Sequence, residues 1–134
     1  MTIHSTFKGQ QSVPSALTIY ASAVGAAAAD MTSPKGAVSI KRTGTGLYTI
    51  LLPRAYKGGL LGISMSVLTS ATAANFALAV LTSTVETDGK ITIALLSSAS
   101  NSANAPIIAD ALTTDTYLFT IHVQDTAQKP AGRV

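Results

Sequence analysis

The chain has 134 residues, of which 47% are hydrophobic and only 11% are charged, and its formal net charge is +3. Soluble domains carry about 25% charged residues, so this weakly charged composition favours a protein that buries part of its surface against partners. The basic residues are spread along the chain, cysteine is absent, and no apolar run reaches about 18 residues. We therefore expect no nucleic-acid groove, no thiolate metal site, no disulfide framework and no membrane-spanning helix.

Residues 1–14 are polar and show neither a helical nor a strand period, which predicts an extended N-terminal arm. Ile3, Phe7 and Val13 are spaced apolar residues within this arm, and we expect them to dock into separate grooves of a partner. The tripeptide at residues 21–23 imitates a secretory cleavage site, but polar residues interrupt the apolar segment before it. We therefore expect no export by this route.

Strands in the first half of the chain are predicted by alternation of apolar and polar residues, which is the side-chain period of a strand. Residues 31–36 contain a Ser-Pro pair and a glycine and are predicted as a turn. Pro53 is expected either to end the strand before it or to place that strand at a sheet edge. The expected strands are residues 17–24, 37–42, 47–52 and 60–69, with residues 70–75 as a connection.

The clearest pattern is a β-hairpin over residues 76–96, where two alternating runs meet at one tight turn. The residues that share one face are Phe76, Leu78, Val80 and Thr82 in the first run, and Ile91, Ile93 and Leu95 in the second. Asp88 and Gly89 both tolerate a positive φ angle, which predicts a two-residue type I′ turn between the strands.

Residues 97–106 are rich in Ser, Ala and Asn and are predicted as a loop, followed by a short element of undefined type at residues 107–112. The final strand is expected to direct Tyr117, Phe119, Ile121 and Val123 toward the core. About seven or eight short strands without an amphipathic helix predict an all-β fold. The expected architecture is a single-domain β-sandwich or jelly-roll-like barrel over residues 15–126, with a C-terminal tail at residues 127–134.

The ionisable residues do not form the pattern of a catalytic or metal site. The two histidines are His4 and His122, and His122 precedes Asp125 by three residues, which places those two side chains on opposite faces of a strand. The six acidic residues stand at predicted turns and strand ends, where short polar side chains bond the backbone. We therefore predict no enzymatic activity, no bound metal and no cofactor.

The Ser39-Ile40-Lys41-Arg42 run, the Gly44-Thr45-Gly46 turn, the strand pattern after it and the loop with Tyr56 together resemble small head proteins of tailed bacteriophages. The resemblance continues through residues 76–80, the Asp88-Gly89 turn, residues 109–111 and the closing run at residues 116–126. It covers the chain from Ser39 to Thr126.

The resemblance implies a capsid decoration or cement protein, which binds the outer surface of a phage capsid in the virion and stabilises contacts between major capsid subunits. Proteins of this kind assemble in the host cytoplasm and are commonly homotrimers, although dimers occur. Lys41, Arg42, Arg54 and Tyr56 lie in the matching region and are expected to contact the partner.

The alternative function is that of a receptor- or glycan-binding β-sandwich domain in a phage head or tail fibre. It is less favoured because sugar sites usually present aromatic platforms. This chain has no Trp and few aromatic residues outside the predicted strands.

Overall fold

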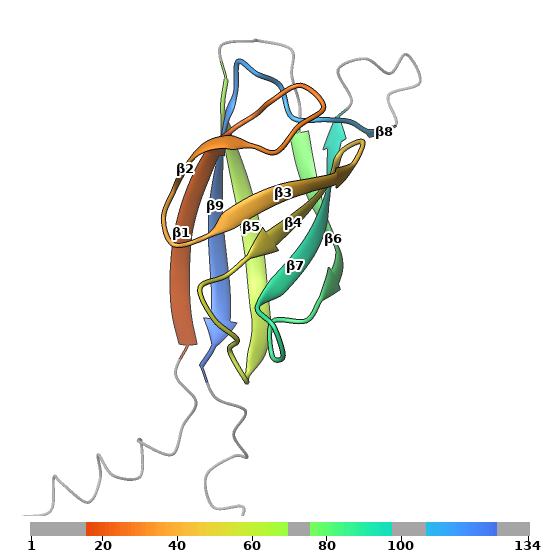
Figure 1. Ribbon diagram of the computed structural model, residues 1–134. Coiled ribbons are helices and arrows are strands. Elements are labelled where there is room, and N and C mark those ends of the chain that lie inside the picture. The colour runs from red at the N-terminus through yellow and green to blue at the C-terminus, as the bar shows by residue number, and fades with distance from the viewer. Residues whose placement is uncertain (1–15, 70–75, 98–106, 126–134) are drawn as a thin grey trace, which may run out of the picture.

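A computed structural model describes residues 16–69, 76–97 and 107–125 of the chain. These residues form nine β-strands and no α-helix, which confirms the predicted all-β class (Figure 1). The strands are β1 (Ala16–Val24), β2 (Thr32–Lys35), β3 (Ser39–Gly44), β4 (Leu47–Leu51), β5 (Gly59–Leu68), β6 (Phe76–Ser83), β7 (Lys90–Ser97), β8 (Ile107–Ile108) and β9 (Thr116–Gln124).

Two antiparallel sheets pack face to face. The first sheet has the strand order β2-β1-β9-β5, and the second has the order β3-β4-β7-β6, with β8 paired to β7. Within the described residues both sheets are open, so the fold is a β-sandwich and not a closed barrel. Consecutive strands repeatedly change sheet, as β2 to β3 and β4 to β5 do, and this interleaving places β9 at the centre of the first sheet.

The core lies between the sheets and is formed by alternate residues of their central strands. The four β9 residues predicted to face the core are each 0–1% exposed, and they are Tyr117, Phe119, Ile121 and Val123. Opposite them, Ile91, Ile93 and Leu95 of β7 are fully buried, as their shared face predicts. Burial of each such side chain contributes about 1.5–3 kcal/mol, which makes these two strands the main source of hydrophobic stabilisation.

The β6–β7 hairpin is present, but the predicted two-residue turn at its tip is wrong. Thr84 donates its backbone N–H to the Lys90 carbonyl and accepts from the N–H groups of Thr87 and Asp88, so the chain makes a longer loop. Val85 within this loop is fully buried. A two-residue turn has no position from which a side chain can reach the core, so burial of Val85 favours the longer loop.

A β-bulge in β6 changes which residues share a face. Val80 pairs with Ile93 while Thr82 pairs with Thr92, so Leu81 is an extra residue between them. Because a shift of one residue moves later side chains to the other face, Thr82 lies on the outer face, and its predicted grouping with Val80 is wrong. Leu81 is left 50% exposed on this edge strand.

The turn predicted at residues 31–36 is also wrong in part, because Thr32–Lys35 forms the edge strand β2 against β1. Every residue of β2 is exposed, and Ser33 has a positive φ of 50°. Pro34 is compatible with this position because an edge strand leaves one row of backbone groups unpaired. A short, proline-containing edge strand also discourages pairing with other chains.

The start of β1 and the end of β9 lie at the same end of the sandwich, where Ala16 pairs with Gln124 (Figure 1). The predicted arm at residues 1–14 and the tail at residues 127–134 lie outside the described residues. The predicted connection at 70–75 and all but Ser97 of the predicted loop at 97–106 lie outside them as well.

Candidate binding surfaces

Asp110 is the centre of the most connected polar cluster among the described residues. Its Oδ1 accepts hydrogen bonds from Arg42 Nε at 2.9 Å and from the Gly46 N–H at 2.7 Å, and its Oδ2 accepts from Arg42 Nη2 at 3.1 Å. The hydrogen bonds from Arg42 lower the pKa of Asp110, and the Gly46 N–H adds to this effect against the opposing effect of burial. These hydrogen bonds connect the β3–β4 hairpin to the segment that precedes β9.

Two buried tyrosines bind the same segment from opposite sheets. Tyr48 of β4 accepts the Ala111 N–H at 2.9 Å, and Tyr117 of β9 accepts the Leu112 N–H at 3.0 Å. Burial is the main cause that raises the pKa of Tyr117 to about 12, and burial also raises the pKa of Tyr48. Both phenols therefore stay protonated at neutral pH, and their role here is to anchor the backbone that closes one end of the core.

Asp115 is fully buried, and its Oδ2 has no hydrogen-bond partner among the described residues. Its Oδ1 accepts from Thr114 Oγ1 at 3.2 Å, while its backbone bonds Gly25 and Leu112. We expect Asp115→Asn to raise the free energy of unfolding by about 1 kcal/mol, because a neutral amide costs less to bury than an ionisable carboxyl group. Urea unfolding measures this change, and a loss of stability would contradict the expectation.

The residues predicted to contact a partner are not gathered at one place. Arg42 is held by Asp110, before the start of β9, whereas Arg54 bonds Asp125, after its end, at 2.7 Å. Arg54 also lies over the ring of Tyr56, 4.2 Å from its centroid. The two described arginines thus lie at opposite ends of the sandwich.

The residues predicted to contact a partner also differ in how far their side chains are exposed. Tyr56 is only 5% exposed, so its side chain offers little surface to a partner. Lys41 is exposed on the outer face of the second sheet, where it stands opposite Thr49. The arm residues Ile3, Phe7 and Val13 lie outside the described residues.

His122 lies on the exposed face of β9, as the alternation predicts, and its Nδ1 is hydrogen-bonded to Thr18 Oγ1 at 3.1 Å. Asp30 and Asp88 bond the backbone N–H groups of Arg42 and Lys90, which is the structural role expected of acidic residues at turns. In the described part of the chain, no group of three or more His, Asp or Glu side chains is arranged to hold a metal ion. No helix there is long and apolar enough to cross a membrane.

Large apolar side chains are exposed at the end of the sandwich where β5 finishes, β8 lies and β9 begins (Figure 1). We call this surface the apolar end, and it consists of Leu68 (66% exposed), Ile107 (43%), Ile108 (49%) and Leu112 (40%). Large exposed apolar patches on soluble proteins mark interaction sites, and these four side chains supply exposed apolar surface at one end of the sandwich. The sequence did not reveal this surface, because Leu68 comes from one predicted strand and the other three from an element of undefined type.

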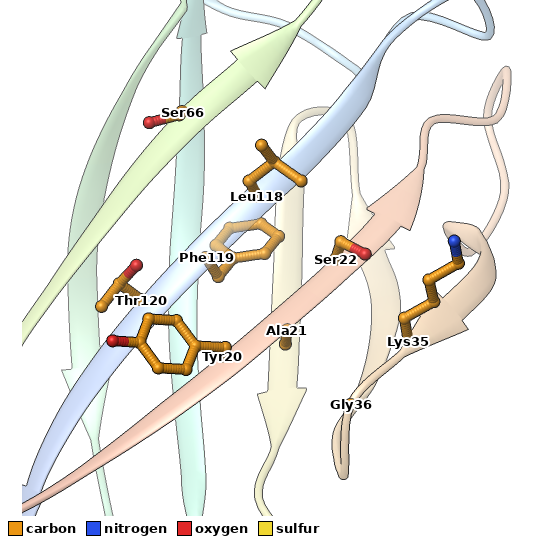
Figure 2. A pocket seen from close by; sticks show the side chains of 9 residues that line it. All are labelled: Tyr20, Ala21, Ser22, Lys35, Gly36, Ser66, Leu118, Phe119 and Thr120. Atoms are coloured by element: carbon orange, nitrogen blue, oxygen red, sulfur yellow. The ribbon is translucent and has the colours of Figure 1, made fainter.

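A second surface feature is a depression of about 450 Å³ on the outer face of the first sheet (Figure 2). Two rows of paired residues frame it: Tyr20 stands opposite Thr120, and Ser22 stands opposite Leu118, which in turn pairs with Ser66. Lys35 of β2 extends the second row, because it pairs with Ser22. Tyr20 is 71% exposed and forms the aromatic wall of the depression.

Comparison of the chain with protein families, with characterised proteins and with solved structures finds no match. The surfaces of the β-sandwich are therefore the observations from which a function is inferred.

Proposed function

We propose that the protein is a structural virion component that binds the outer surface of a phage capsid and stabilises contacts between major capsid subunits, as a decoration or cement protein does. The apolar end is the observation that carries this proposal. A weakly charged β-sandwich with four large apolar side chains exposed at one end is suited to bury that end against another protein. The resemblance of residues 39–126 to phage head proteins supports the capsid as the proposed partner.

Stabilisation of the shell follows from mass action. A protein that binds only the assembled capsid lowers the free energy of that state by an amount set by its concentration and affinity. A sandwich with a well-packed core serves this purpose because it loses little conformational freedom when it binds. Self-association, most simply as a homotrimer, and contacts from Ile3, Phe7, Val13 and Lys41 belong to the same proposal.

The apolar end can be tested with two leucines from the same strand. Leu68 lies at its end and is 66% exposed, whereas Leu61 lies near its other end and is 53% exposed. We expect Leu68→Ser to weaken binding to empty capsids about tenfold, since full burial of a leucine contributes about 1.5–3 kcal/mol. We expect the matched control Leu61→Ser to change binding less than about twofold.

Co-sedimentation with expanded empty capsids, assembled from the major capsid protein of the same genome, measures these affinities. Light scattering on the free protein gives the oligomeric state, for which a mass well above the 13.6 kDa of one chain is expected. Failure of the unmodified protein to sediment with the capsids would refute the proposal, as would equal losses in the two leucine variants.

A receptor- or glycan-binding fibre domain is the second candidate, and one observation favours it. Tyr20 is a largely exposed aromatic residue at the wall of a depression, which is the kind of platform that composition alone had argued against.

A further inference from the structure

We propose that the depression on the outer face of the first sheet is a saccharide-binding site, and that it prefers a sugar carrying a carboxylate. This site is separate from the apolar end and does not depend on the capsid role. It is formed by Tyr20, Ser22, Lys35, Ser66, Leu118 and Thr120, together with backbone of the strands that carry them (Figure 2).

The Tyr20 ring provides the apolar contact that a sugar needs. Its position in β1 opposite Thr120 directs it to the outer face, while its neighbour Ala21 is buried in the core. The face of an aromatic ring carries partial negative charge, so it attracts the polarised C–H groups on one side of a pyranose ring. Leu118, which is 41% exposed, adds apolar surface beside it.

Three hydroxyl groups supply the polar contacts. Ser22, Ser66 and Thr120 can each donate one hydrogen bond and accept two, which matches the mixed donors and acceptors of sugar hydroxyls. Among the described residues, these three side chains make no hydrogen bond with another protein group, so they can bond a ligand without losing an internal partner.

The charge of the lining favours an acidic sugar. Among the described residues that line the depression, Lys35 has the only charged side chain, and none has a carboxylate. Lys35 is exposed at the edge strand β2, so its ammonium group can approach a ligand carboxylate without first being freed from an ion pair in the described residues. A uronic acid or another carboxylated sugar is therefore the best match of charge.

The same composition argues against a protein as the occupant. Serine and lysine are depleted in the cores of protein–protein interfaces, which are rich in large apolar and aromatic side chains. In the depression, Ser22, Ser66 and Lys35 occupy positions that such an interface would fill with apolar groups. An open, hydroxyl-lined depression with one aromatic wall suits a hydrated ligand better.

The test is an NMR titration of the full-length protein with trigalacturonate as the acidic probe and maltotriose as the neutral one. We expect trigalacturonate to shift backbone amide signals of β1, β2 and β9, and to bind more tightly than maltotriose. Tyr20→Ala is expected to weaken trigalacturonate binding about tenfold, because it removes the stacking surface. Since Tyr20 is 71% exposed, this change leaves the core intact.

Lys35→Gln is expected to weaken trigalacturonate binding about threefold to fivefold while leaving maltotriose binding unchanged. The matched control is Lys90→Gln, an exposed lysine at the start of a strand of the other sheet, which is expected to change neither affinity.

Three results would overturn the proposal. The first is that neither probe, nor any saccharide on a glycan array, binds the unmodified protein. The second is that Tyr20→Ala leaves trigalacturonate binding unchanged while Lys90→Gln weakens it as much as Lys35→Gln does. That result would indicate general attraction to surface lysines. The third is loss of capsid sedimentation in Tyr20→Ala without any saccharide binding, which would make this face a protein contact. Failure of the capsid proposal alone leaves all saccharide results unaffected.

Discussion

Gly46→Ala is expected to lower the free energy of unfolding by about 3–5 kcal/mol, because the turn between β3 and β4 has no room for a side chain. Gly46 has a φ of +69°, in the left-handed region that costs other residues about 1–2 kcal/mol. A Cβ atom there would lie 2.5 Å from Ile108 Cγ2 and 2.7 Å from the backbone nitrogen of Ala109. The backbone of the adjoining segment would therefore have to move.

That movement would also break the hydrogen bonds that Gly46 makes. Its N–H donates to Asp110 Oδ1 at 2.7 Å, and its carbonyl accepts the Leu95 N–H at 2.8 Å. Each lost bond costs about 0.5–1.5 kcal/mol, and more where a buried group is left without a partner. The strained φ angle, the steric conflict and the lost bonds together account for the size of the expected effect.

Gly44→Ala is the matched control from the same hairpin. Its φ angle is not in the left-handed region, and its nearest contact is Leu47 Cδ1 at 3.3 Å, the end of a flexible side chain. We expect a loss below about 1 kcal/mol there. Urea unfolding followed by circular dichroism measures both variants. A Gly46→Ala protein within 1 kcal/mol of the unmodified one would show that the Ile108–Ala109 segment adapts at little cost.

The sequence predicted the central strands of the fold because their pattern is long and regular. In β9, every second residue from Tyr117 to Val123 is apolar, and such a run fixes both the strand and its buried face. β2 was missed because Pro34 and Gly36 are turn formers in most contexts, and only pairing with β1 makes Thr32–Lys35 a strand.

The candidate surfaces were not predictable from local pattern, because they depend on how distant strands align. Tyr20 and Thr120 face the same depression only because the register of β1 against β9 places them opposite each other. The longer β6–β7 loop likewise depends on a tertiary contact, since Val85 accepts the Tyr56 N–H through its carbonyl and buries its side chain. A propensity-based prediction has access to neither fact.

The bond between Arg42 and Asp110 shows the same limit, because it joins residues 68 positions apart. The sequence indicated that acidic residues at turns bond the backbone, and Asp110 does so at Gly46. It did not indicate that Arg42, which is predicted to contact a partner, is also paired within the protein.

Asp110→Asn is expected to lower the free energy of unfolding by about 2 kcal/mol at neutral pH. The amide can still accept at its oxygen, but it loses the charge that strengthens the bonds to Arg42 and Gly46, and its NH₂ group would face the guanidinium. The side chains of Arg42 and Asp110 remain 22% and 23% exposed, so water screens the ion pair. The Gly46 bond therefore contributes a large share of the expected loss.

The pH dependence distinguishes loss of the charge from loss of packing. Because the pKa of Asp110 is lower in the folded protein than in the unfolded chain, its stabilising effect is fully present above the unfolded value of about 4. The effect disappears as the pH falls from there through the lower folded value. The unmodified protein should thus be more stable than Asp110→Asn near pH 5, and this difference in the free energy of unfolding should disappear toward the lowest pH at which the unmodified protein stays folded.

Glu86→Gln, at an exposed position, is the control carboxyl substitution. A constant difference between the unmodified protein and Asp110→Asn across this range would mean that shape, and not charge, is what Asp110 contributes.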